Sequence, residues 1–87
     1  MPVRVHPRVS AKRPEITDDD AQAAFAGTLR RIPRFDTEPV QWIGVGLDTR
    51  GRLVEWVAIE NKADEWLIFH AMPATTKTLI EVGLRER

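Results

Sequence analysis

The residues of this chain best suited to chemistry are His70, Glu55 and Lys77. His70 interrupts an apolar run over residues 65–72, and Lys77 follows shortly after the proline that ends this run. A histidine oriented by a carboxylate can act as a general acid or base, and a nearby cation can balance phosphate charge. A histidine in an apolar strand is more often a hydrogen-bonded packing residue, and a Glu–His contact can be a plain cross-strand ion pair. Both interpretations stay open at this stage.

Length and composition indicate a single domain over residues 1–87 with a small core. The chain has no cysteine, which excludes disulfides and thiolate metal sites and fits a reducing cytoplasm. Its two histidines, His6 and His70, lie in no cluster with metal-ligand spacing, so neither a metal nor another cofactor is expected. No apolar run approaches the roughly 20 residues of a membrane span, and the amino end lacks the apolar core of a signal peptide.

Net charge is zero, with 13 basic and 13 acidic residues, but the signs are segregated. Residues 1–14 contain no acid, and we call their cations the basic front segment: Arg4, Arg8, Lys12 and Arg13. Such a segment can bind a polyanion such as RNA, although a solvated charged face is an equally good explanation. Trp42 and Trp66 offer aromatic rings on which a base can stack.

The amino-terminal half predicts mainly helix. A short edge strand is expected at 3–6 and a weak helix at 8–13. Thr17 precedes three aspartates and is therefore predicted to cap a second helix, whose apolar spacing continues to Ile32. Pro33 is expected to end it.

The carboxy-terminal half predicts strands. Alternating apolar residues separated by turn residues, followed by threonines that can cap a helix, indicate strands at 40–48, 52–60 and 65–72, turns at 48–51 and 61–64, and a final helix from 75 or 76 to about 83. The expected fold class is α+β: a three- or four-stranded antiparallel sheet with N-terminal helices and a C-terminal helix packed on one face.

Turn length decides which side chains share a sheet face. If the first turn closes as a loop of two or four residues, Val45 lies on one face with Trp56. A turn over 61–64 then pairs Glu55 with His70 on the opposite face, together with both candidate stacking tryptophans. The residues expected to be mostly buried are Ile43, Val45, Trp56, Phe69, Phe25 and Leu29.

Two segments resemble a known family. Val5-His6-Pro7-Arg8-Val9 with Ile16-Thr17-Asp18-Asp19-Asp20 resembles the start of small RelE/BrnT-like toxins of type II toxin–antitoxin systems. Ile68-Phe69-His70-Ala71-Met72-Pro73-Ala74-Thr75-Thr76-Lys77 is similar to the last strand of that group and its exit into a helix.

The resemblance implies an α+β fold with an antiparallel sheet and an mRNA endoribonuclease, ribosome-dependent or free. It implies a bacterial protein of the cytoplasm that is held silent by an antitoxin encoded beside it. His70 falls near the strand-end serine of the family, Met72 where an arginine is expected, and Lys77 near its following basic positions. Arg4, Arg8 or Lys12 can replace that arginine only if the basic front segment folds beside His70.

Two functions therefore compete. The first is a metal-independent endoribonuclease in which the catalytic residues are His70, Glu55 and Lys77 and the RNA-binding residues are Arg4, Arg8, Lys12, Arg13, Trp42 and Trp66. The second is a non-catalytic protein-interaction module with a degenerate toxin-like fold, whose tryptophans anchor a partner. The ribonuclease needs an accessible His70, whereas the interaction module needs exposed tryptophans.

Overall fold

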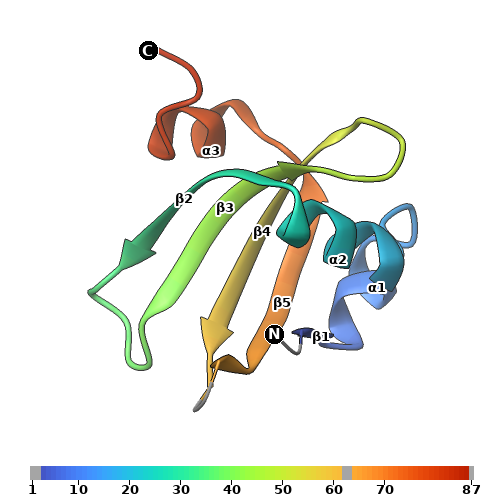
Figure 1. The fold of residues 1–87 in the computed structure, drawn as a ribbon, viewed down its shortest axis with the longest axis horizontal. Coiled ribbons are helices and arrows are strands. Elements are labelled where there is room, and N and C mark those ends of the chain that lie inside the picture. The colour runs from blue at the N-terminus through green and yellow to red at the C-terminus, as the bar shows by residue number, and fades with distance from the viewer. Residues whose placement is uncertain (1–2, 62–63, 87) are drawn as a thin grey trace.

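One mixed five-stranded sheet organises the molecule, with strand order β1-β5-β4-β3-β2 (Figure 1). The structure is a computed structural model, which describes residues 3–61 and 64–86. The strands are β1 (Val3–Val5), β2 (Thr28–Arg34), β3 (Gln41–Leu47), β4 (Leu53–Glu60) and β5 (Trp66–Pro73). The helices are α1 (Arg8–Lys12), α2 (Asp18–Ala26) and α3 (Thr76–Glu81). No helix in the described ranges has the length and apolar character needed to cross a membrane.

The α+β class is confirmed, but the predicted three or four antiparallel strands are wrong. β1 is the front strand suggested by the sequence, and it pairs with β5 in the parallel direction. The remaining neighbours are antiparallel. The additional strand is β2, which occupies a stretch predicted to be helical.

The start of α2 agrees with its sequence. The Thr17 side chain accepts a hydrogen bond from the Asp20 backbone N–H, and the Asp20 carboxylate accepts one from the Thr17 N–H. This reciprocal capping satisfies two otherwise unpaired amides at the helix start. Ile16, directly before the cap, is fully buried with Ala21.

The predicted continuation of this helix to Ile32 is wrong, because α2 ends at Ala26 with Gly27 as its C-cap. The Thr28 hydroxyl donates to the carbonyl oxygen of Phe25 and so satisfies the helix end. The chain then extends as β2 at the edge of the sheet, where a proline is tolerated because its missing N–H need not join a ladder. Leu29 is consequently 50% exposed rather than buried.

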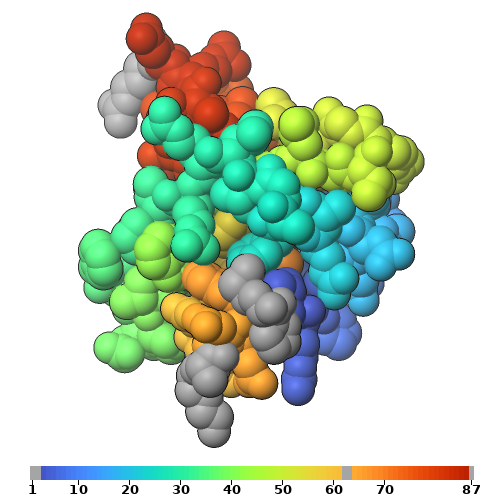
Figure 2. Space-filling view, viewed as in Figure 1, coloured from blue at the N-terminus to red at the C-terminus, as the bar shows by residue number. Residues whose placement is uncertain are grey.

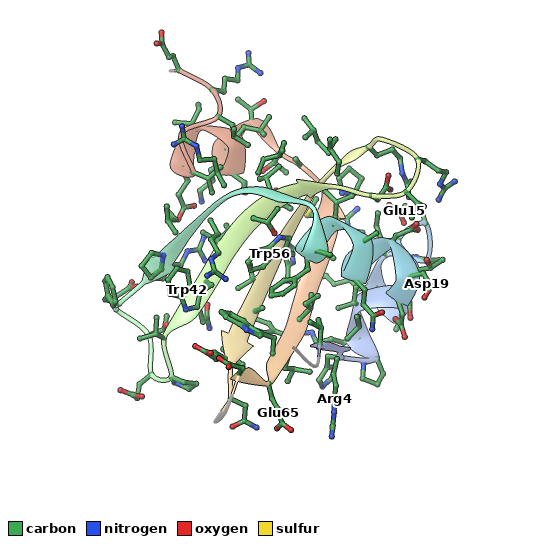
Figure 3. All side chains as sticks on the ribbon, in the orientation of Figure 1. Arg4, Glu15, Asp19, Trp42, Trp56 and Glu65 are labelled. Carbon is green, nitrogen blue, oxygen red and sulfur yellow. The ribbon has the colours of Figure 1, made fainter. Side chains whose placement is uncertain are left out.

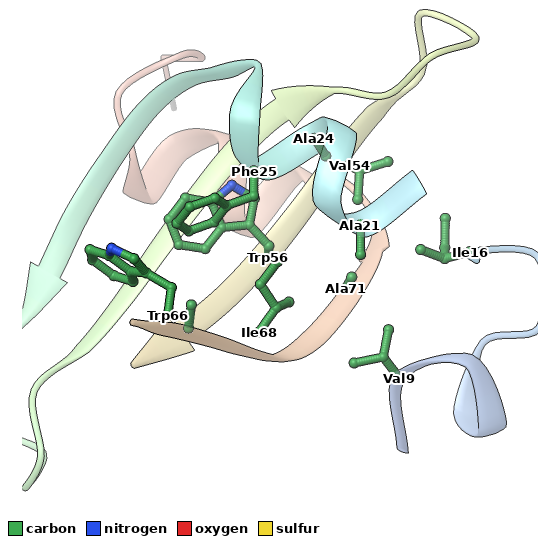
Figure 4. Close-up of a cluster of buried hydrophobic side chains, with 11 residues drawn as sticks. Val9, Ile16, Ala21, Ala24, Phe25, Val54, Trp56, Trp66, Ile68 and Ala71 are labelled. Carbon is green, nitrogen blue, oxygen red and sulfur yellow. The ribbon is translucent and has the colours of Figure 1, made fainter. Parts of the chain in front are cut away.

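Helices cover both faces of the sheet, so the prediction that they pack on one face is wrong. We call the two sides the α2 face and the α3 face. The α2 face holds the larger core, in which Phe25 packs against Trp56 and Trp66 (Figure 4). The α3 face carries a second core of Ile43, Val45, Val57 and Val82, with Phe69 and Leu79 packed against it. Figure 2 shows how α2 and the chain after it cover part of the sheet on the side in view.

The register of the first hairpin explains this second core. Leu47 pairs with Leu53, so the connection over 48–52 contains an odd number of residues. Val45 therefore lies opposite Glu55, and Trp56 lies opposite Gly44 on the other face. The predicted burial of Ile43, Val45, Trp56 and Phe25 is confirmed, but Val45 and Trp56 do not share a face, and Phe69 is only half-buried.

Gly44 and Gly46 permit the close packing above β3. A Cβ on Gly44 would stand 2.3 Å from the Trp56 ring, and one on Gly46 would stand 1.9 Å from the carbonyl oxygen of Ala24. The neighbour of Gly46 is backbone of α2, which cannot move without shifting the helix. The space that the two glycines leave above this strand is thus filled by the protein's own α2 and Trp56.

We expect Gly46→Ala to lower the free energy of unfolding by about 3 kcal/mol, because the added methyl overpacks the α2–β3 contact. Urea unfolding followed by circular dichroism measures this loss. Thr49→Ala, in the exposed turn, is the matched control and should change stability by less than about 0.5 kcal/mol. Equal stability of the two variants would contradict the proposed packing.

Candidate functional site

His70 reaches Glu55 because of an irregularity in β5. Val57 pairs with His70 but its neighbour Ala58 pairs with Ile68, so Phe69 is an extra residue opposite this step. Such a bulge changes the alternation of side chains after it. His70 consequently points to the α3 face, where its Nε2 lies 2.9 Å from Glu55 Oε2. The predicted contact is confirmed, although Glu55 lies directly opposite Met72 rather than opposite His70.

Glu55 is a buried carboxylate with its oxygens fully engaged. It is 5% exposed, and its Oε1 accepts hydrogen bonds from the Thr75 backbone N–H and the Thr75 hydroxyl at 2.9 and 2.8 Å. Thr75 also caps α3 by accepting from the Thr78 N–H, as the sequence suggested. Burial raises the pKa of Glu55, but hydrogen bonds from the Thr75 backbone, His70, and the Thr75 and Thr78 side chains outweigh it, so the pKa is lowered overall.

This environment assigns the His70 tautomer. An ionised carboxylate only accepts hydrogen bonds, so the ring must donate from Nε2 to Glu55. Nδ1 has no hydrogen-bond partner in the described parts of the chain. The neutral ring therefore carries its proton on Nε2 and leaves Nδ1 as the nitrogen able to accept a proton.

The three predicted catalytic residues line one open depression with a volume of about 360 Å³. The His70 side chain is 34% exposed there, whereas that of Glu55 is 7% exposed. Arg8 and Lys77 are exposed at the same depression, and neither forms an ion pair within the described residues. The full lining is Arg8, Arg34, Gln41, Ile43, Glu55, Val57, Phe69, His70, Thr75, Lys77, Thr78 and Glu81.

Part of the basic front segment folds beside His70. This position is the condition for the segment to replace the arginine expected at Met72. A second, smaller depression on the α1 side is lined by Arg8, Val9, Lys12, Arg13, Phe69, His70, Ala71 and Met72. Arg13 Nη2 lies 3.9 Å from the Met72 sulfur. His70 therefore stands between cations of α1 and Lys77 of α3.

The other predicted RNA-binding residues lie elsewhere. Trp42 and Trp66 are on the α2 face, where Trp66 is 5% exposed and packs edge-on against Trp42. The guanidinium of Arg31 lies 4.9 Å from the centre of the Trp42 ring. Arg4 lies at the end of the sheet near Glu65 (Figure 3), and it lines neither depression that contains His70. We therefore leave these three predicted residues out of the candidate site.

Sequence reasoning missed Arg34. This residue follows Pro33, which was interpreted as a helix stop, and only the β2 pairing brings it to the depression. Its guanidinium binds Glu81 of α3 through two parallel hydrogen bonds, Nε to Oε2 at 3.1 Å and Nη2 to Oε1 at 3.0 Å. That hydrogen bonding raises the pKa of Arg34, and the negative charge of Glu55 adds to the effect.

No group of three or more metal-ligating His, Cys, Asp or Glu side chains occurs within residues 3–61 and 64–86. No family model matches the chain, and no curated protein or solved structure is significantly similar to it.

Glu55 should make stability sensitive to acid. Its pKa is lowered from an ordinary value of 4.5, so its contribution is present above that pH and is lost as pH falls through the folded value. We expect Glu55→Gln to reduce the acid-dependent loss of unfolding free energy, measured in urea from about pH 7 to about pH 3. Asp20, whose pKa is lowered first by its bond with the Thr17 backbone, keeps part of the slope in this variant. An unchanged slope in Glu55→Gln would contradict the assigned hydrogen bonds.

The tautomer is testable by NMR. In the neutral ring of the wild type, ¹⁵N shifts should place the proton of His70 on Nε2. In Glu55→Gln the amide can donate, so the proton should move to Nδ1. His6 provides an internal reference because its Nδ1 accepts from the Arg8 backbone N–H. A His70 proton on Nδ1 in the wild type would reject the assignment.

Proposed function

We propose that this chain is a toxin-like, metal-independent endoribonuclease. The observation that carries the proposal is a histidine held by a buried carboxylate and open at a depression with two cations, Arg8 and Lys77, that form no ion pair within the described residues. Cleavage of RNA without a metal needs a base for the 2′-hydroxyl, an acid for the leaving oxygen and positive charge for the phosphate. The depression offers residues for all three tasks.

In the proposed reaction His70 Nδ1 takes the proton of the 2′-hydroxyl. The 2′-oxygen forms a bond to phosphorus while the bond from phosphorus to the 5′-oxygen breaks. Lys77 supplies a proton to the leaving 5′-oxygen, which gives a 2′,3′-cyclic phosphate and a 5′-hydroxyl. Glu55 stabilises the ring as it becomes positively charged, and Arg8 balances the phosphate charge.

The contrast between the two candidate functions favours catalysis. The interaction module predicted that Trp42 and Trp66 are exposed, but Trp66 is 5% exposed and Trp42 is partly buried. The ribonuclease predicted an accessible His70, and that side chain is 34% exposed. The exposed apolar residues Leu29 and Phe35, at and just after the edge strand, leave room for a protein partner as well.

The proposal extends to the substrate, compartment and partner of the RelE/BrnT-like toxins that the chain resembles. The substrate would be mRNA, free or on the ribosome, in a bacterial cytoplasm, and the protein partner an antitoxin. A short DNA-binding protein encoded in the neighbouring reading frame would support this setting. Co-expression of that neighbour should relieve any growth arrest caused by the chain alone.

We expect His70→Gln to reduce RNA cleavage by about 10²–10⁴-fold, the usual contribution of a general base, while leaving the fold intact. The assay follows a fluorescent single-stranded RNA in the presence of EDTA. Lys77→Ala and Arg8→Ala should also reduce cleavage, whereas Arg50→Ala removes an equal charge outside the depression and should not. Folded wild-type protein that neither cleaves RNA nor slows bacterial growth would contradict the proposal.

A further inference from the structure

Arg34 has the guanidinium geometry that suits phosphate binding, yet Glu81 already occupies its two parallel donor positions. A guanidinium that makes two parallel hydrogen bonds to a carboxylate has the geometry with which arginine also binds phosphate. Arg34 makes these bonds to Glu81, and both residues line the depression that contains His70. The carboxylate of Glu81 therefore stands where a phosphate oxygen pair would bind.

We propose that Glu81 is an internal substitute for phosphate, and that a phosphate group entering the depression displaces it from Arg34. This inference rests on the proposed function, because the phosphate would be the one next to the cleaved bond. The inference assigns to Arg34 the stabilisation of phosphate charge. In the resembled family this role would fall to an arginine at the position that Met72 occupies in this chain.

The charge balance of the depression supports an exchange of partners. Its lining holds three cations, Arg8, Arg34 and Lys77, and two carboxylates, Glu55 and Glu81. Glu55 is buried and bound on both oxygens, so it cannot leave. Glu81 is the carboxylate that can move: its side chain is 29% exposed, and it lies in the last turn of a short helix.

The exposure of the pair makes exchange feasible. The side chain of Arg34 is 34% exposed, so solvent screens its attraction to Glu81. A phosphodiester carries the same single negative charge as a carboxylate, but in this depression it gains additional attraction from Arg8 and Lys77. Displacement then swaps one two-pronged contact for another and leaves no cation unpaired.

The test is binding of inorganic phosphate, followed by NMR through the ring of His70 and the Nε–H of Arg34. Glu81→Gln should bind phosphate roughly tenfold more tightly than the wild type, because it leaves the guanidinium without a competing charge. Arg34→Ala should bind it more weakly, and Arg34→Lys should also, because lysine lacks the fork. Glu60→Gln is the control: it removes the same charge from an exposed position outside the depression.

Equal phosphate affinity in Glu81→Gln and Glu60→Gln would overturn the inference and identify the pair as a strut between β2 and α3. If Arg34→Ala fails to fold, the comparison of Arg34→Lys with Glu81→Gln still decides. The RNA assay separates the two proposals. Tighter phosphate binding in Glu81→Gln without RNA cleavage by any variant supports the exchange and contradicts the ribonuclease. Cleavage that is unaffected by Arg34→Lys supports the ribonuclease and contradicts the exchange.

Discussion

The arrangement around His70 depends on the buried carboxylate of Glu55. A charge this far from solvent is tolerated only when its oxygens are hydrogen-bonded, and β4 offers it no partner. The partners come from β5, through the His70 ring, and from the start of α3, through the Thr75 backbone and hydroxyl. One side chain thus fixes the tautomer of the histidine and the position of the helix that carries Lys77 and Glu81. Glu55 therefore determines both the geometry around His70 and the packing of α3 on the sheet.

The bulge at Phe69 is the second constraint. Regular alternation from Ile68, which belongs to the α2 face, would point His70 into the same core as Trp56 and Phe25. The extra residue turns the histidine to Glu55 and leaves Phe69 packed beside Val57. A single backbone irregularity thus decides whether the histidine is a core residue or an accessible one. Both interpretations of His70 were open from sequence because nothing local marks the bulge.

Features set by neighbouring residues were predicted correctly, but the assignment of side chains to the two faces of the sheet was not. The cap at Thr17 and the strand cores follow from neighbouring residues, so sequence predicts them. The faces of β4 depend on the number of residues in the connection after Leu47, which turn chemistry alone left ambiguous. The Glu55–His70 contact was predicted from a wrong register, and it survives because diagonal neighbours on one face also touch. Arg34 could not be predicted as a site residue from the sequence, because pairing of β2 with β3 overrides the helical pattern that continues up to Ile32.

A chain of zero net charge can still present a positive site, because most of its acids lie outside the depression. Asp20 and Asp48 bind Arg50 and Arg52 at the far turn, where they stabilise the start of α2 and the first hairpin. Within residues 3–61 and 64–86 the cations of α1 and Lys77 form no such ion pairs, and the acids that line the depression are the buried Glu55 and the partly exposed Glu81. Its position on Arg34 leaves the depression with a net excess of one positive charge before any ligand arrives. Attraction for a phosphate is thus present in the resting protein and becomes stronger when Glu81 yields.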